Sequence, residues 1–95
     1  MNDAAHSALW RVSGTVQGVG FRWYVSKNAR AMGVDGWVRN LESGEVLVHA
    51  CAALKKLETL RALILEGPPG SRVEGIQDVQ EQPEMPASSP FSIIR

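Results

Sequence analysis

The sequence predicts an α+β fold of the ferredoxin-like type, a βαββαβ sandwich with two helices on one face of an antiparallel sheet. Three observations support this fold class. Two segments have apolar residues at helical spacing, five others have the pattern of strands, and the order is strand, helix, strand, strand, helix, strand, with a short extra strand at the C-terminal end. The 95 residues suit a single domain, expected to span residues 1–95 with a flexible tail over residues 1–7.

The first strand is predicted at residues 9–13, where Trp10 and Val12 alternate with polar side chains. A glycine-rich segment then leads into a helix that ends at Gly33, a residue type typical of a helix C-cap. The apolar face of this helix recurs every three or four residues and consists of Phe21, Val25, Ala29 and Met32.

A hairpin is predicted next, with strands at residues 34–40 and 46–51 joined by a turn at residues 42–45. The second helix is predicted at about residues 52–66, and the segment Gly67-Pro68-Pro69-Gly70 ends it. Its apolar stripe consists of Leu54, Leu57, Leu60 and Ile64.

The fourth strand, predicted at residues 72–81, has an irregular pattern. Val73 and Val79 fall on one face, and Ile76 breaks this alternation, which predicts a bulge or a twist. A proline-containing loop follows, and residues 91–95 are predicted to form a short final strand.

The composition is that of an ordinary globular domain, with 44% hydrophobic and 21% charged residues. The single cysteine, Cys51, excludes an intrachain disulfide and suits a reducing compartment. No signal-peptide pattern opens the sequence, and no apolar run approaches the length that crosses a membrane. We therefore expect a cytoplasmic protein that does not associate with membranes.

The net charge is zero, but the charges are distributed unevenly. Residues 1–40 carry five basic and two acidic side chains, whereas residues 41–95 carry five basic and eight acidic ones. This modest excess suits a small anionic ligand such as inorganic phosphate better than a nucleic acid. We expect a monomer with a small-molecule substrate.

The segment from Ser13 to Arg22 is a candidate anion site, because three glycines precede a helix that begins with an arginine. Glycine amides and a helix N-terminus together can hold an anion, and a cation in the first turn is unfavourable unless an anion lies near it. The glycine spacing fits neither a Walker loop nor a dinucleotide fingerprint. The plainer alternative is a glycine-rich connector with a solvated arginine.

The predicted topology brings a second polar residue to the same region. The first two strands, joined by a helical crossover, run parallel, so their carboxyl ends lie at one edge of the sheet. The glycine-rich loop leaves the first strand there and Asn40 ends the second strand there, so Arg22 and Asn40 can face one site. The alternative for Asn40 is a local role in the turn that follows.

Two segments resemble the two signatures of the acylphosphatase family. They are Gly14-Thr15-Val16-Gln17-Gly18-Val19-Gly20-Phe21-Arg22 and Gly36-Trp37-Val38-Arg39-Asn40, the latter followed by Gly44 and Val46. Other family-like segments are Gly67-Pro68-Pro69, Arg72-Val73 and Phe91-Ser92-Ile93-Ile94-Arg95. The resemblance covers nearly the whole chain after residue 8.

This resemblance implies hydrolysis of acyl phosphates to carboxylate and inorganic phosphate, by attack of water and without a metal or other cofactor. It implies that Arg22 and Asn40 are the catalytic residues, with Asn40 orienting the water. It also implies that the phosphate is held by the Arg22 guanidinium and by the loop amides of Gln17, Gly18, Val19, Gly20, Phe21 and Arg22.

Other functions remain open from the residues alone. The fold also serves RNA-binding and regulatory modules, and a related site could act on carbamoyl phosphate within a larger assembly. Arg39 is expected on the sheet face opposite Asn40, in solvent. His6 and His49 have no partners at metal-ligand spacing, so no metal site is expected.

Overall fold

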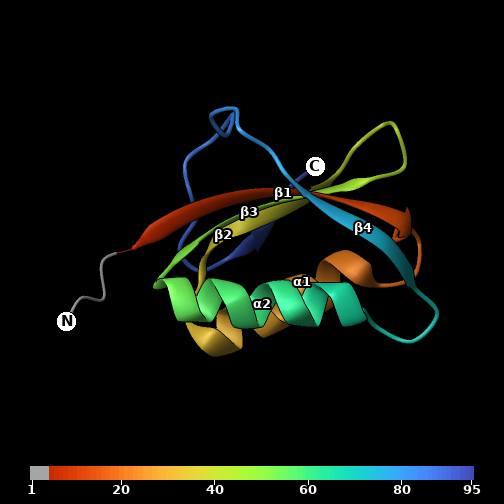
Figure 1. The fold of residues 1–95 in the computed structure, drawn as a ribbon, viewed down its shortest axis with the longest axis horizontal. Coiled ribbons are helices and arrows are strands. Elements are labelled where there is room, and N and C mark those ends of the chain that lie inside the picture. The colour runs from red at the N-terminus through yellow and green to blue at the C-terminus, as the bar shows by residue number, and fades with distance from the viewer. Residues whose placement is uncertain (1–4) are drawn as a thin grey trace.

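The computed structural model describes residues 5–95 and confirms the predicted order of elements. Both helices lie on one face of the sheet, in the ferredoxin-like arrangement (Figure 1). The elements are β1 (His6–Thr15), α1 (Phe21–Met32), β2 (Asp35–Asn40), β3 (Val46–Ala52), α2 (Leu54–Glu66), β4 (Arg72–Asp78) and β5 (Ser92–Ile93).

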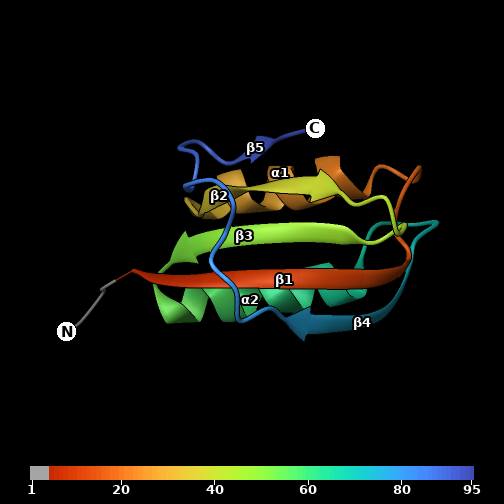
Figure 2. The same cartoon turned by 90° about the horizontal axis from the view of Figure 1, so that it is seen from above.

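The sheet has five strands in the order β4-β1-β3-β2-β5. Strands β1 and β2 each pair antiparallel with β3, so they run in the same direction, as predicted. The four strands β1 to β4 pair antiparallel, as predicted, and the short extra strand β5, whose direction was not predicted, pairs parallel with β2. The carboxyl ends of β1, β2 and β5 therefore share one edge of the sheet (Figure 2).

The bounds of three strands, β1, β4 and β5, differ from the prediction by more than one residue. Strand β1 begins at His6, because its first residues pair with Cys51 and Ala52 of β3, so His6 and Ser7 do not belong to a tail. Residues 1–4 of the predicted tail lie outside the described residues. Strand β4 ends at Asp78, and β5 has only two residues.

The predicted irregularity in β4 is a bulge. Ser13 of β1 pairs with Gly75 and the next residue, Gly14, pairs with Val73, which leaves Glu74 without an opposite residue. The extra residue reverses the alternation of side chains. This explains how Val73 and Ile76 both pack against the core although they are three residues apart.

The main core lies between the sheet and the helices. Its fully buried members include Val12, Val38 and Val48 from the sheet and Val25, Leu60 and Ile64 from the helices. A second buried set, on the other face of the sheet, contains Trp37 and His49. The loop before β5 covers this set, and Trp37 Nε1 donates a hydrogen bond to the Met85 carbonyl at 3.1 Å.

Within residues 5–95, neither helix is long and apolar enough to cross a membrane.

Candidate active site

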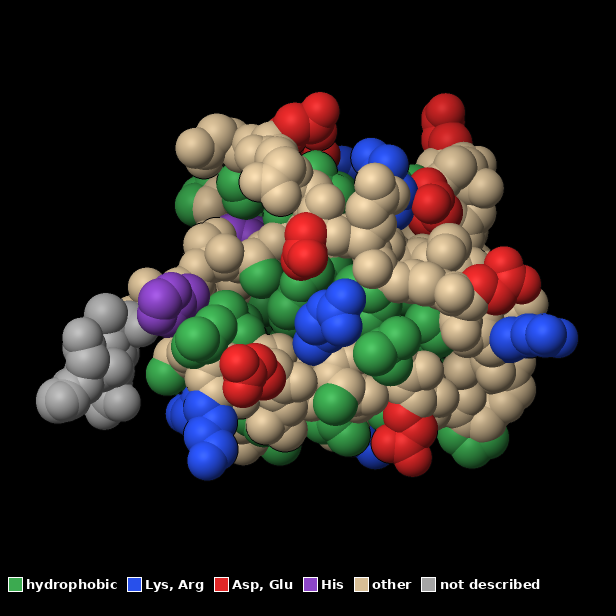
Figure 3. Space-filling model, in the orientation of Figure 1, with side chains coloured by type: hydrophobic (Ala, Val, Ile, Leu, Met, Phe, Trp, Pro, Cys, Tyr) green, Lys and Arg blue, Asp and Glu red, His purple; other side chains and the backbone are tan. Residues whose placement is uncertain are grey.

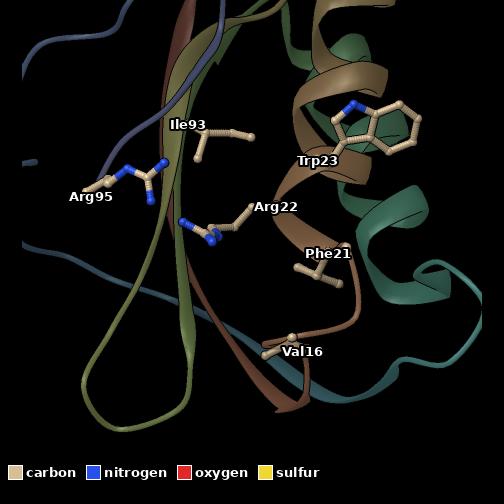
Figure 4. A pocket seen from close by; sticks show the side chains of 8 residues that line it. Val16, Phe21, Arg22, Trp23, Ile93 and Arg95 are labelled. Atoms are coloured by element: carbon tan, nitrogen blue, oxygen red, sulfur yellow. The ribbon is translucent and has the colours of Figure 1, made fainter.

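A cavity of about 240 Å³ lies between the N-terminal end of α1 and the residues around β5 (Figure 4). We call it the Arg22 cavity. It is lined by Val16, Gly18, Gly20, Phe21, Arg22, Trp23, Ile93 and Arg95. The cavity therefore combines most of the predicted glycine-rich loop with a segment of the chain about 70 residues away in sequence.

The loop enters α1 through two glycines in the left-handed region, Gly18 with φ 77° and Gly20 with φ 76°. Gly20 is the N-cap residue and its carbonyl accepts a hydrogen bond from the Tyr24 amide at 3.0 Å, and no side chain of residues 5–95 caps the helix. The first N–H groups of a helix have no partner within the helix. The amides at the start of α1 are therefore available to an anion in the cavity.

Arg22 is half-buried in the wall of this cavity. Within residues 5–95 its guanidinium has neither a hydrogen-bond partner nor an ion-pair partner, and the first turn of α1 carries no acidic residue. The helix N-terminus and the guanidinium thus place positive charge in the same cavity with no acidic side chain beside them.

Gln17 and Val19, also predicted to hold the ligand, do not line the cavity. The Gln17 side chain instead donates hydrogen bonds to the carbonyls of Leu41 and Glu45, each at 2.9 Å. It thereby joins the loop to the turn that follows Asn40. Val19 packs against the main core.

Asn40 is the last residue of β2 and shares the helix-facing side of the sheet with Val38. Its Oδ1 atom is buried and has no hydrogen-bond partner among the described residues. A buried acceptor without a partner costs about 1–3 kcal/mol unless water or a ligand satisfies it. Asn40 does not line the Arg22 cavity itself, although the shared sheet edge brings both to the same end of the molecule.

Arg39 lies on the opposite side of β2 from Asn40, as predicted. The prediction that it is solvated is wrong, because it is partly buried and forms an ion pair with Glu84. Glu84 lies in the loop before β5, so this ion pair helps to hold that loop over Trp37.

Sequence reasoning missed Val16, Trp23, Ile93 and Arg95 as lining residues. Trp23 and Ile93 are exposed hydrophobic residues, at 62% and 40% exposure. Ile93 and Arg95 were missed because the sequence did not indicate the direction of β5. Only a strand parallel to β2 brings its carboxyl end to this edge of the sheet. Among residues 5–95, no three His, Cys, Asp or Glu side chains are grouped as metal ligands would be.

Comparison with known proteins agrees with this geometry. A family model described as Acylphosphatase matches residues 9–93. The chain is 45% identical over 74 residues to the acylphosphatase of Thermococcus kodakarensis, over 78% of this chain and 81% of that protein. The structure of the acylphosphatase from Bacillus subtilis is similar with a TM-score of 0.78 and 28% identity, over 94% of this chain and 98% of that one.

Part of a much larger protein is also similar. A structure of full-length HypF in the phosphate- and nucleotide-bound form matches with a TM-score of 0.83 and 27% identity, over 100% of this chain and 12% of HypF. The match of the family model to nearly the whole described chain, together with the relative from Thermococcus kodakarensis, shows that this chain belongs to the acylphosphatase family of enzymes.

Proposed function

We propose that this protein hydrolyses acyl phosphates to a carboxylate and inorganic phosphate, with water as the nucleophile. The observation that carries the proposal is the Arg22 cavity, in which an unpaired guanidinium lies beside the uncapped N-terminus of α1. The buried, unpartnered Oδ1 of Asn40 at the same edge of the sheet supplies the second part of the site.

Phosphate binding follows from the loop and Arg22. The amides at the start of α1 donate to phosphate oxygens, and the helix N-terminus favours their negative charge. The Arg22 guanidinium adds a planar pair of donors that matches two phosphate oxygens. Phosphoryl transfer depends mainly on this kind of positioning and charge stabilisation.

Asn40 orients the attacking water in this proposal. Its Oδ1 accepts a hydrogen bond from the water, which satisfies the buried oxygen and directs a lone pair of the water toward phosphorus. A neutral amide does this without taking the proton, which passes to the phosphoryl group as the bond to the acyl oxygen breaks. Because the leaving group is a stable carboxylate, no strong general acid is required.

The composition of the cavity supports direct attack by water. Of the described residues that line it, none is Cys, Ser, His, Asp or Glu, so none offers a nucleophile for a phosphoenzyme. The proposed reaction therefore has no covalent intermediate on the chain, and we propose that the protein acts as a cytoplasmic monomer without a cofactor.

Carbamoyl phosphate is a second candidate substrate. Part of HypF, whose structure was solved with phosphate and a nucleotide bound, shares this fold. Carbamoyl phosphate carries the same carboxyl-phosphate anhydride. A site that holds the phosphate and leaves the acyl end open would accept it as well.

The test is hydrolysis of acetyl, benzoyl and carbamoyl phosphate by the purified chain in excess chelator. We expect turnover of at least one of them, and loss of turnover in Arg22→Ala. Arg61→Gln, on α2, is the matched control for removal of a positive charge. Absence of turnover by the wild-type chain, or turnover that requires added magnesium, would contradict the proposal.

A further inference from the structure

The Arg22 cavity continues into a groove of about 590 Å³ between α1 and β5. The groove shares Trp23 and Ile93 with the cavity and is otherwise lined by Ser26, Lys27, Arg30 and Ser92. Of the described residues that line the cavity or the groove, none is acidic. One lysine, Lys27, therefore shares a continuous hollow with the proposed phosphate site.

The Lys27 side chain extends along α1 toward the cavity. Lys27 lies five residues after Arg22, which corresponds to about 7.5 Å along a helix axis. Long side chains on a helix point back toward its N-terminus. Lys27 does so, because its Nζ atom lies 4.7 Å from the centre of the ring of Trp23, four residues earlier. The amine thus contacts a side chain that lines both the cavity and the groove.

The Lys27 amine is accessible and weakly held. Lys27 is exposed, and the Trp23 side chain beneath it is 62% exposed. Within residues 5–95 the Lys27 ammonium forms no ion pair. A cation–π contact at an exposed site is weak, so the side chain can leave the ring and exchange its proton with solvent.

An acyl phosphate has two electrophilic atoms. In the proposed hydrolysis, the water held by Asn40 attacks phosphorus on the side opposite the acyl group. The carbonyl carbon is not attacked in that reaction, and it lies beyond the groups that hold the phosphate. A primary amine that reaches this carbon forms an amide and releases the same inorganic phosphate.

Building on the proposed function, we propose that Lys27 is a site of self-acylation by the acyl phosphate bound at Arg22. The neutral amine attacks the carbonyl carbon, a C–N bond forms, and the bond from that carbon to the bridging oxygen breaks. Inorganic phosphate leaves with the electron pair, and the proton of the amine passes to solvent. Arg22 and the α1 amides bind the phosphate, so they also stabilise the charge of this leaving group.

Acylation changes the charge beside the cavity. The Lys27 ammonium becomes a neutral amide, and the acyl group stays in the groove next to Trp23. A unit charge about 10 Å away changes the binding of an anion by roughly 2-fold in water. Self-acylation therefore raises KM by a similar factor when acyl phosphate is abundant, and it leaves kcat nearly unchanged.

The test compares the three lysines of the chain after incubation with acetyl phosphate and chelator, by mass spectrometry of peptides. Lys55 and Lys56 are matched controls, because they are also exposed and belong to α2. This helix lies on the face seen in Figure 3, where acidic and basic side chains are interspersed. We expect Lys27 to be acetylated roughly 10-fold faster than either control, a small part of what proximity to a bound reactant can give.

Loss of the phosphate site should remove this difference. Arg22→Ala and excess inorganic phosphate should each lower the acetylation of Lys27 to that of the controls, whereas Arg61→Gln, on α2, should keep the difference. N-hydroxysuccinimidyl acetate, a reagent without phosphate, should acetylate all three lysines at similar rates. A preference for Lys27 with this reagent, or one that persists in Arg22→Ala, would overturn the inference. Equal acetylation of the three lysines by acetyl phosphate would also overturn it.

Kinetics and the paired outcomes separate this inference from the proposed function. Lys27→Gln, which removes the charge as acylation does, should raise KM roughly 2-fold, and Lys27→Arg, which keeps the charge, should not. Hydrolysis of acetyl phosphate without preferential acetylation of Lys27 would refute the self-acylation alone. Acetylation of Lys27 that phosphate prevents, without hydrolysis, would refute the proposed reaction while the role of Lys27 stands.

Discussion

The Gln17 side chain donates a hydrogen bond to the carbonyl of Leu41, the residue directly after Asn40, at 2.9 Å. The same amide nitrogen donates to Glu45 at 2.9 Å. One side chain thus holds the loop before Arg22 in register with the strand end that carries Asn40. The two parts of the proposed site come from separate elements, and Gln17 links them.

Removal of the Gln17 hydrogen bonds should make the position of the loop relative to Asn40 less well defined. Gln17→Met removes two hydrogen bonds and leaves the Leu41 and Glu45 carbonyls with only their backbone donors, the amides of Gly44 and Leu41, so we expect a loss of about 1–2 kcal/mol in the free energy of unfolding. We also expect roughly a 10-fold loss in kcat, because small misplacements of catalytic groups are costly. Urea unfolding and steady-state kinetics measure the two effects. Thr59→Val, which removes an exposed hydrogen bond on α2, is the control. An unchanged kcat in Gln17→Met would show that the link does not position the site.

Arg22→Ala should lower kcat/KM by about 10³ or more, by analogy with arginines in other phosphoryl-transfer sites. Arg22→Lys should restore little, since a point charge does not replace two parallel donors. Thermal unfolding should show an unchanged or slightly higher stability, because a cation is removed from a helix N-terminus. A lysine variant with near-normal kinetics would refute the requirement for guanidinium geometry.

Asn40→Ala should lower kcat by roughly 10²–10³ and leave the affinity for inorganic phosphate nearly unchanged, because the proposed contact is to the water. Asn40→Asp should be no better, since its negative charge repels the substrate. Single-turnover hydrolysis and competitive inhibition by phosphate measure the two quantities, with Arg22→Ala as the variant that should lose phosphate affinity. If phosphate affinity falls as steeply as the rate, Asn40 is a binding or structural residue instead.

Ionisation of Tyr24 should lower the free energy of unfolding at high pH. Burial, with a smaller contribution from the negative charge of Glu66, raises the pKa of Tyr24 above its ordinary value of 10.0. Below pH 10 the phenol is protonated in both folded and unfolded chains, so its contribution to stability is complete there. As pH rises from 10 through the higher pKa of the folded chain, the unfolded chain loses its proton first and stability falls.

Because Tyr24 is the only tyrosine, tyrosinate absorbance reports it directly. The midpoint of the tyrosinate titration should lie above pH 10 in the native chain and near pH 10 in the denatured chain. Tyr24→Phe removes the 2.7 Å hydrogen bond to the Leu63 carbonyl, which should cost about 1 kcal/mol below pH 10. Because phenylalanine does not ionise, Tyr24→Phe should also remove the fall in stability above pH 10 that Tyr24 causes. A native midpoint at or below that of the denatured chain would contradict the prediction.

The sequence by itself determined the order of the elements, the two helices and an irregularity in β4, which the structure shows to be a bulge. It also determined that Arg22 begins a helix after a glycine-rich loop and that Asn40 ends the second strand. These features depend on residues that are near each other in the chain: apolar periodicity, glycines that allow positive φ, and prolines that end helices. The direction of β2 then follows from the helical crossover before it.

Only the tertiary structure decided the direction of β5, and with it the position of Arg95 in the cavity. A two-residue edge strand can pair in either direction, and local sequence does not distinguish them. The same holds for the early start of β1, the Gln17 hydrogen bonds and the Arg39–Glu84 ion pair. Each joins residues more than 20 positions apart, so it depends on which surfaces the folded chain brings together and not on the pattern around either partner.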